Sequence, residues 1–151
     1  MKNTTTYLPR RSFCAALSLA ILSLVSVAPA ASAKEGESGS QSQSRSRAPL
    51  AGPVLNSETP NGHADFRVDS GHNRTRLNVE VEDVNLAQGT KLTVVIDRSG
   101  TRTTVGSIQL DALHSGELEL NSEDGDAVPA VQKGDIVIVM NGNSAILTGV
   151  F

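Results

Sequence analysis

The amino-acid sequence predicts an all-β fold, and three observations support that prediction. From Gly62 onward, apolar and polar residues alternate with a period of two, which is typical of half-buried strands. Turn-forming residues interrupt the alternation at a spacing of roughly 10 to 15 residues. The same region shows no convincing helical period. We therefore expect about seven short strands in an antiparallel β-sandwich, with a small closed β-barrel as the alternative.

Seven segments carry the strand pattern. In the first, 62–69, Ala64, Phe66 and Val68 would share the buried face. The second, 77–82, alternates leucine and valine with asparagine and glutamate. The other five are 92–96, 101–110, 117–120, 136–139 and 145–151.

Local signals refine this pattern. Gly106 shifts the apolar phase within its segment, which predicts a β-bulge. The segment 136–139 is apolar on both faces, as expected of a central strand. Asn141-Gly142 is a strong hairpin signal that turns the chain into the last segment. We expect Phe151 to pack into the core and to fix that last strand.

The N-terminal residues, 1–33, have the three parts of an export signal. A basic start is followed by an apolar stretch, 15–27, that is too short to span a membrane. The run 31–33, Ala-Ser-Ala, is typical of a cleavage site, so we expect cleavage after Ala33, with the run 28–30, Ala-Pro-Ala, as the alternative. Residues 10–13, Arg-Arg-Ser-Phe, resemble the twin-arginine export motif, and the general secretory route is the alternative. The mature protein would then be secreted or periplasmic, and the source bacterial.

Residues 34–60 are predicted to form a disordered linker before a β-domain at 61–151. Serine alternates with glycine, glutamine and arginine up to residue 46, and no large apolar side chain occurs before residue 49. Nothing in such a stretch offsets the entropy of ordering the backbone. Prolines at 49, 53 and 60 favour an extended, irregular continuation.

Charge and composition exclude several functions for the mature chain. Removal of 1–33 takes three of the 13 basic residues and none of the 16 acidic ones, so the formal charge changes from −3 to −6. This sign disfavours nucleic acid and anionic membranes as partners. The mature chain has no cysteine, so its stability must come from a hydrophobic core and not from disulfides.

Metal ligands are the first candidate chemistry. His63, His72 and His114 match no ligand spacing, and we interpret them as exposed histidines at or near turns. The acidic run Glu123–Asp126 offers oxygen ligands for calcium but lacks the EF-hand spacing. Asp124-Gly125 is ordinary turn chemistry, so we predict a turn there. The sequence therefore assigns no metal site and no cofactor.

Catalytic groups are also not assigned. Glu80/Glu82 and Glu117/Glu119 could suggest glycoside hydrolysis, but both pairs alternate with apolar residues and are predicted to form a solvated sheet face. No Gly-x-Ser-x-Gly elbow and no phosphate-binding glycine loop occurs. We expect a protein that is not an enzyme.

The order of motifs resembles that of small uncharacterised β-rich modules in secreted proteins of environmental bacteria. The motifs are VEVED at 79–83, GTxLxV at 89–94, IxLD at 108–111, GELEL at 116–120 and VPAVxxGD at 128–135. A fainter similarity links the chain to chordin-type domains, whose paired histidines are absent here. Neither resemblance implies a catalytic residue.

These observations lead to a functional hypothesis with two alternatives. We expect an exported, non-catalytic β-sandwich with a structural or protein-interaction role, whose partner is another envelope or extracellular protein. A long exposed edge strand would be its contact surface, by strand pairing. The alternatives are a protein that binds a metal or small ligand and, third, a hydrolytic enzyme. No membrane insertion is expected after signal cleavage.

Overall fold

The structure is a computed structural model and describes residues 42–151. The predicted signal peptide, 1–33, and the linker residues 34–41 lie outside the described residues. None of the helical structure within 42–151 is long and apolar enough to span a membrane. The elements in chain order are β1 (Gln43–Ala51), β2 (Asn61–Asp69), β3 (Arg74–Glu82), β4 (Lys91–Arg98), β5 (Thr101–Gln109), β6 (Gly116–Asn121), the 3-10 turn η1 (Ser122–Asp124), β7 (Ile136–Asn141) and β8 (Ser144–Val150).

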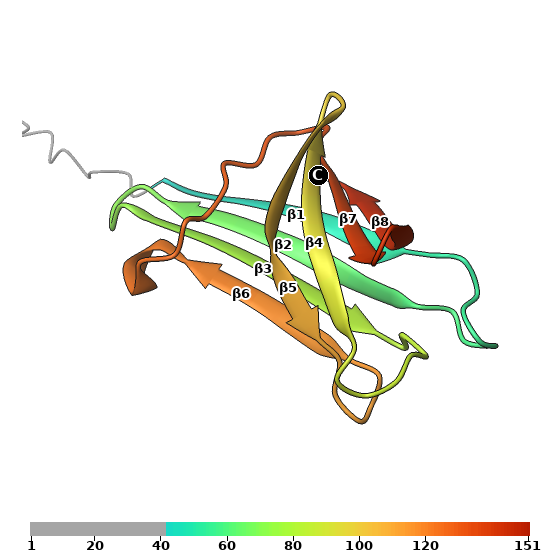
Figure 1. The fold of residues 1–151 in the computed structure, drawn as a ribbon. Coiled ribbons are helices and arrows are strands. Elements are labelled where there is room, and N and C mark those ends of the chain that lie inside the picture. Colours follow the sequence, from blue (N-terminus) through green and yellow to red (C-terminus); the bar gives the residue numbers. More distant parts are fainter. Residues whose placement is uncertain (1–41) are drawn as a thin grey trace, which may run out of the picture. The chain divides into compact units, whose positions relative to one another are not determined.

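The strands form one antiparallel hydrogen-bonded order, β5-β4-β7-β8-β1-β2-β3-β6. A single residue pair, Ala51 and Thr148, joins β1 to β8. The order therefore consists of two four-stranded halves, β5-β4-β7-β8 and β1-β2-β3-β6. Figure 1 shows the strands of one half crossing those of the other. The sheet curls so far that its two end strands, β5 and β6, approach each other: a Cβ on Gly106 would lie 2.7 Å from Leu118 Cδ2.

The hydrophobic core lies between the two halves. On β3, Leu77, Val79 and Val81 are fully buried, and on β4 Leu92 and Val94 are fully buried. These residues lie at alternate positions, so each strand turns one face to the core. Burying one such side chain contributes about 1.5–3 kcal/mol relative to exposure. The rest of the cluster on the strands comprises Ala48, Leu50, Ala64, Phe66, Ile96, Ile108, Val137, Val139, Ile146 and Leu147.

The predicted all-β antiparallel fold is confirmed, with eight strands where the sequence predicted about seven. All eight belong to one curled, nearly closed sheet, which agrees with the barrel alternative. The two facing halves nevertheless enclose a core in the manner of a sandwich. The local predictions are confirmed as well: β5 has its irregularity at Val105 and Gly106, opposite Val94/Val95, and β7 and β8 form a hairpin closed by Asn141 and Ser144. Phe151 is buried in the core cluster.

The predicted linker, 34–60, is wrong from residue 43 onward, because β1 lies inside it. All nine residues of β1 pair with β2, from Gln43 opposite Asp69 to Ala51 opposite Asn61. Ala48 and Leu50 are buried in the core, and they anchor a strand whose other side chains are small or polar. This long-range ladder supplies the stabilisation that local composition lacks. The β-domain therefore includes residues 43–60 as well as the predicted 61–151.

Candidate functional site

The three candidate histidines lie in different places, each beside its own carboxylate. The ring-nitrogen to oxygen distances are 3.5 Å for His63–Glu80, 2.8 Å for His72–Asp69 and 3.6 Å for His114–Glu58. His72 and His114 lie in turns, as predicted, whereas His63 lies on β2 and is half-buried. Within residues 42–151, no three His, Cys, Asp or Glu side chains gather closely enough to hold a metal ion.

The acidic run Glu123–Asp126 forms a turn, as predicted. Its first two residues belong to η1, and Asn121 closes the turn by donating from Nδ2 to Asp124 Oδ2 at 2.8 Å and from its backbone N to Asp126 Oδ2 at 2.9 Å. Glu123 Oε2 lies 2.9 Å from Arg74 Nε. Protein donors therefore already contact these carboxylates.

The glutamates of β3 and β6 lie on the outer face of their half-sheet. Glu80 is directly opposite Glu117, and Glu119 is opposite Asn78. The neighbouring positions in both strands turn leucine or valine toward the core. The prediction of a solvated sheet face is thus confirmed for these residues.

The outer edge of β5 is the first candidate site. β5 pairs with β4 on one side and with no strand of the described residues on the other. Its second half is flanked by β6, but Thr101–Thr104 is exposed. A cleft of about 650 Å³ opens beside this first half, between Thr101 and Thr103 on β5 and Pro129 and Ala130 on the β6–β7 connection.

An ion pair holds the far wall of this cleft in place. Arg98, at the end of β4, donates from Nε to Asp135 Oδ1 at 2.9 Å and from Nη2 to Asp135 Oδ2 at 2.6 Å. The same Nη2 donates to the carbonyl of Ala130 at 2.8 Å, and Gln132 N donates to Asp135 Oδ2 at 2.8 Å. The hydrogen bonds from Arg98 hold the pKa of Asp135 below its usual value, although burial opposes them. The β6–β7 connection is therefore tied to the end of β4.

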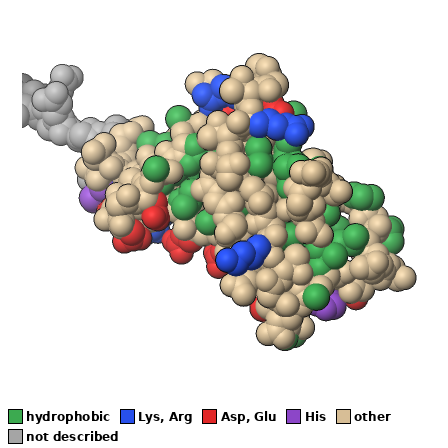
Figure 2. Space-filling model, in the orientation of Figure 1, with side chains coloured by type: hydrophobic (Ala, Val, Ile, Leu, Met, Phe, Trp, Pro, Cys, Tyr) green, Lys and Arg blue, Asp and Glu red, His purple; other side chains and the backbone are tan. Residues whose placement is uncertain are grey.

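The surface around β5 differs from the outer face of the other half-sheet. Figure 2 views the molecule from the side of β4 and β5, where most of the surface is uncharged. Basic side chains appear at the top of this view, where Figure 1 places the β4–β5 turn, which Arg98 and Arg102 flank.

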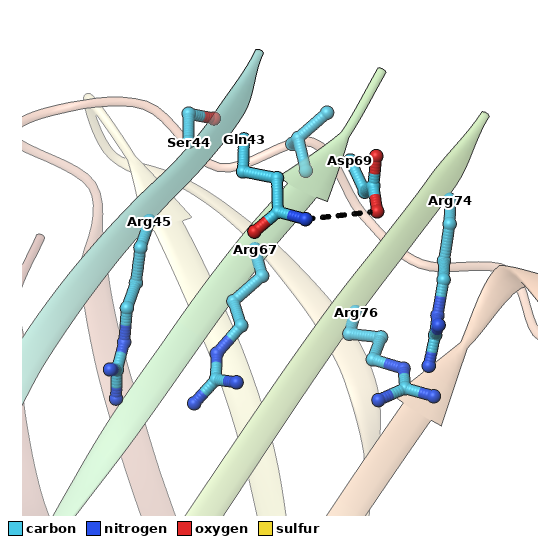
Figure 3. Close-up of a pocket in the computed structure, with 8 residues that line it drawn as sticks. Gln43, Ser44, Arg45, Arg67, Asp69, Arg74 and Arg76 are labelled. Atoms are coloured by element: carbon cyan, nitrogen blue, oxygen red, sulfur yellow. Dashed lines mark hydrogen bonds between the residues drawn. The ribbon is translucent and has the colours of Figure 1, made fainter. Parts of the chain in front are cut away.

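A row of arginines on the outer face of β1, β2 and β3 is the second candidate site. Arg45 is directly opposite Arg67, and Arg67 is directly opposite Arg76. We call these three residues the arginine row. Figure 3 shows them side by side across three strands, with Arg74 beside Arg76. A cavity of about 410 Å³ lies along the row and is also lined by Gln43.

Asp65 is the buried anion of this face. Its side chain is 4% exposed, and it accepts hydrogen bonds from Arg45 Nε at 2.9 Å and from Arg67 Nε at 3.1 Å. Burial raises the pKa of Asp65, but the hydrogen bonds and positive charges of Arg45 and Arg67 together outweigh burial and leave its pKa below the usual value. One carboxylate thus positions two of the three guanidinium groups.

Sequence reasoning missed both candidate sites. The arginines are separated by up to 31 residues of sequence, and only the strand register places them side by side. Arginines at alternate positions, Arg45 with Arg47 and Arg74 with Arg76, were the available signal, because alternate positions share one face of a strand. Comparison with protein-family models and with curated proteins finds no match for this chain.

Proposed function

We propose that this protein is an exported, non-catalytic interaction module that binds an extended segment of an envelope or extracellular protein along β5. The observation that carries the proposal is the exposed first half of β5, Thr101–Thr104, beside a cleft. An edge strand offers unpaired backbone N–H and C=O groups, and a partner strand can satisfy them by extending the sheet.

The length of the exposed edge of β5 favours a short partner strand. Four extended residues span roughly 13 Å. Past them, the bulge at Val105 and the approach of β6 near Gly106 interrupt the edge. A bulge limits pairing with other chains, so this edge supports a short contact and disfavours extended self-association.

The cleft indicates which side chains the partner strand would carry. Its walls combine two threonines with Pro129 and Ala130, and Ile96 also lines it. Small apolar or β-branched side chains fit such walls at every second position of a strand. Arg98 and Asp135 keep the far wall in place, so the cleft is formed before the partner arrives.

Site-specific photo-crosslinking in the native envelope tests this proposal. A photoreactive residue at Thr103 should crosslink one protein, whereas the same residue at Ser107, on the same strand beyond the bulge, should crosslink much less. Thr103→Lys should abolish the complex, because a charge facing the cleft blocks strand pairing. Ser107→Lys is the matched control and should leave the complex intact. A protein that stays alone throughout, or equal crosslinking at both positions, would refute the proposal.

A further inference from the structure

We propose that the arginine row is a binding site for one phosphate or sulfate group, held between Arg67 and Arg76. This site lies on the outer face of β1, β2 and β3, and it does not depend on the function proposed for β5. The register of the three arginines, their unused donors and the surrounding charges support this site.

The register places like charges directly opposite each other. Arg45, Arg67 and Arg76 are direct cross-strand partners on one sheet face. Neighbouring strands are ~4.8 Å apart, and like charges at opposed positions destabilise a sheet. Asp65 relieves this repulsion between Arg45 and Arg67, which both donate to it. Within the described residues, no carboxylate contacts both Arg67 and Arg76 in this way.

The donors of Arg67 and Arg76 are largely unused. Arg67 donates only its Nε to Asp65 within the described structure. Arg76 has Glu123 as its nearest carboxylate, with Nη2 4.0 Å from Oε2, which is too long for a hydrogen bond. Its Nε is buried and has no hydrogen-bond partner among the described residues. A buried donor without a partner is costly. The side chains of Arg67 and Arg76 are 56% and 39% exposed, so an oxyanion between them would contact their Nη groups.

The carboxylates near the row include Asp69, which lines the same cavity and already has other partners. Asp65 is used by Arg45 and Arg67, and Asp69 by His72 and Gln43. Glu123 contacts Arg74 at 2.9 Å, and Glu119 lines a small neighbouring cavity without an ion pair to the row. Four guanidinium groups, of Arg45, Arg67, Arg74 and Arg76, thus face two carboxylates that contact them.

The chemistry of guanidinium selects the ligand class. Its planar fork of N–H donors matches phosphate, sulfate and carboxylate oxygens in pairs, and Arg67 and Arg76 could present two such forks to one tetrahedral group. The acidic net charge of the chain opposes a long polyanion, because the patch is small and surrounded by negative charge. A single phosphate or sulfate, either free or carried as an ester on a sugar, fits best.

Thermal unfolding of the full chain tests this site. Low-millimolar inorganic phosphate or sulfate should raise the melting temperature above that in sodium chloride of equal ionic strength, because a ligand that binds the folded state stabilises it. Arg76→Gln should lose this rise while melting no lower than the wild type in chloride, because a repelled charge is removed. Arg102→Gln, which removes an exposed arginine on the other half-sheet, is the matched control and should keep the rise.

A second measurement covers the case in which Arg76→Gln fails to fold. In the wild type, the side-chain Nε–H resonances of Arg67 and Arg76 should shift on phosphate addition, and that of Arg102 should not. Tighter binding of a sugar phosphate than of inorganic phosphate would identify an ester as the ligand, and equal binding would identify the free ion. Binding that survives Arg76→Gln, or equal shifts at all three arginines, would overturn the proposal.

Discussion

Asp135→Asn is expected to destabilise the protein by about 2 kcal/mol, because it breaks the ion pair that ties the β6–β7 connection to β4. Asp135 is 3% exposed and accepts from Arg98 Nε at 2.9 Å, from Arg98 Nη2 at 2.6 Å and from Gln132 N at 2.8 Å. Hydrogen bonds to a buried charged group contribute about 1.5–3 kcal/mol each. The Arg98 side chain is 43% exposed, so solvent screens part of this gain. Asparagine also keeps one acceptor oxygen, so the net loss corresponds to about one such hydrogen bond, roughly 2 kcal/mol.

Urea unfolding at neutral pH measures this loss. The urea concentration at the midpoint of unfolding should fall, while the dependence of the free energy on urea concentration stays unchanged. The melting temperature should fall by roughly 8 °C, because 1 kcal/mol shifts the melting temperature of a domain of this size by about 4 °C. Arg102→Gln is the control, because Arg102 is 59% exposed and its pair with Asp97 contributes at most about 1 kcal/mol. If Asp135→Asn costs no more than Arg102→Gln, the ion pair does not hold the connection as we argue.

The same variant gives a pH test. The hydrogen bonds from Arg98 outweigh burial and hold the pKa of Asp135 below its usual value. The stabilisation is therefore complete above the unfolded pKa, about 3.9, and is lost as pH falls through the folded pKa. Asparagine cannot titrate at this position. The difference in the free energy of unfolding between the wild type and Asp135→Asn should therefore shrink below about pH 4. A difference in the free energy of unfolding that stays constant down to pH 2 would show that the Asp135 carboxylate does not stabilise the fold through its charge.

Three further predictions concern β1 and metals. Gly149→Ala should cost about 1–3 kcal/mol in urea unfolding, because its Cβ would lie 2.3 Å from the carbonyl oxygen of Pro49; an unchanged midpoint would mean that β1 and β8 do not approach closely. A chain that begins at residue 52 lacks Ala48 and Leu50 and should lose cooperative thermal unfolding; melting like the full chain would restore the linker interpretation. Calcium, zinc or copper added after EDTA should shift the melting temperature by less than about 1 °C, and a larger rise would reveal a metal site.

Local patterns in the sequence predicted most of the fold. The alternation at Leu77, Val79 and Val81 identified a core-facing strand because side chains in a strand change faces at every residue. The bulge at Gly106 and the hairpin at Asn141 followed equally from short-range chemistry. Each of these features depends on residues within one strand or one turn, so the sequence pattern indicates it even when the pairing strand is unknown.

Features that depend on distant partners could not be predicted in this way. β1 has a composition typical of a linker, and its order comes from the ladder to β2 and from the burial of Ala48 and Leu50. The arginine row needs the register of three strands, which single-strand patterns do not specify. The cleft beside β5 needs the path of the β6–β7 connection, which Asp135 and Arg98 fix. In each case the deciding interaction joins residues that are far apart in the chain.

The junction of Ala51 with Thr148 has a consequence for the order in which the chain can fold. The half-sheet of β1, β2, β3 and β6 is complete once residue 121 has been synthesised, but β4 acquires its neighbour β7 only after residue 141. A chain that lacks β7 therefore leaves one edge of β4 unpaired, although β5 already covers the other edge. Such surfaces aggregate when they are left uncovered. Pairing of β7 with β4 covers this edge, and β8 then joins the two halves through Ala51 and Thr148.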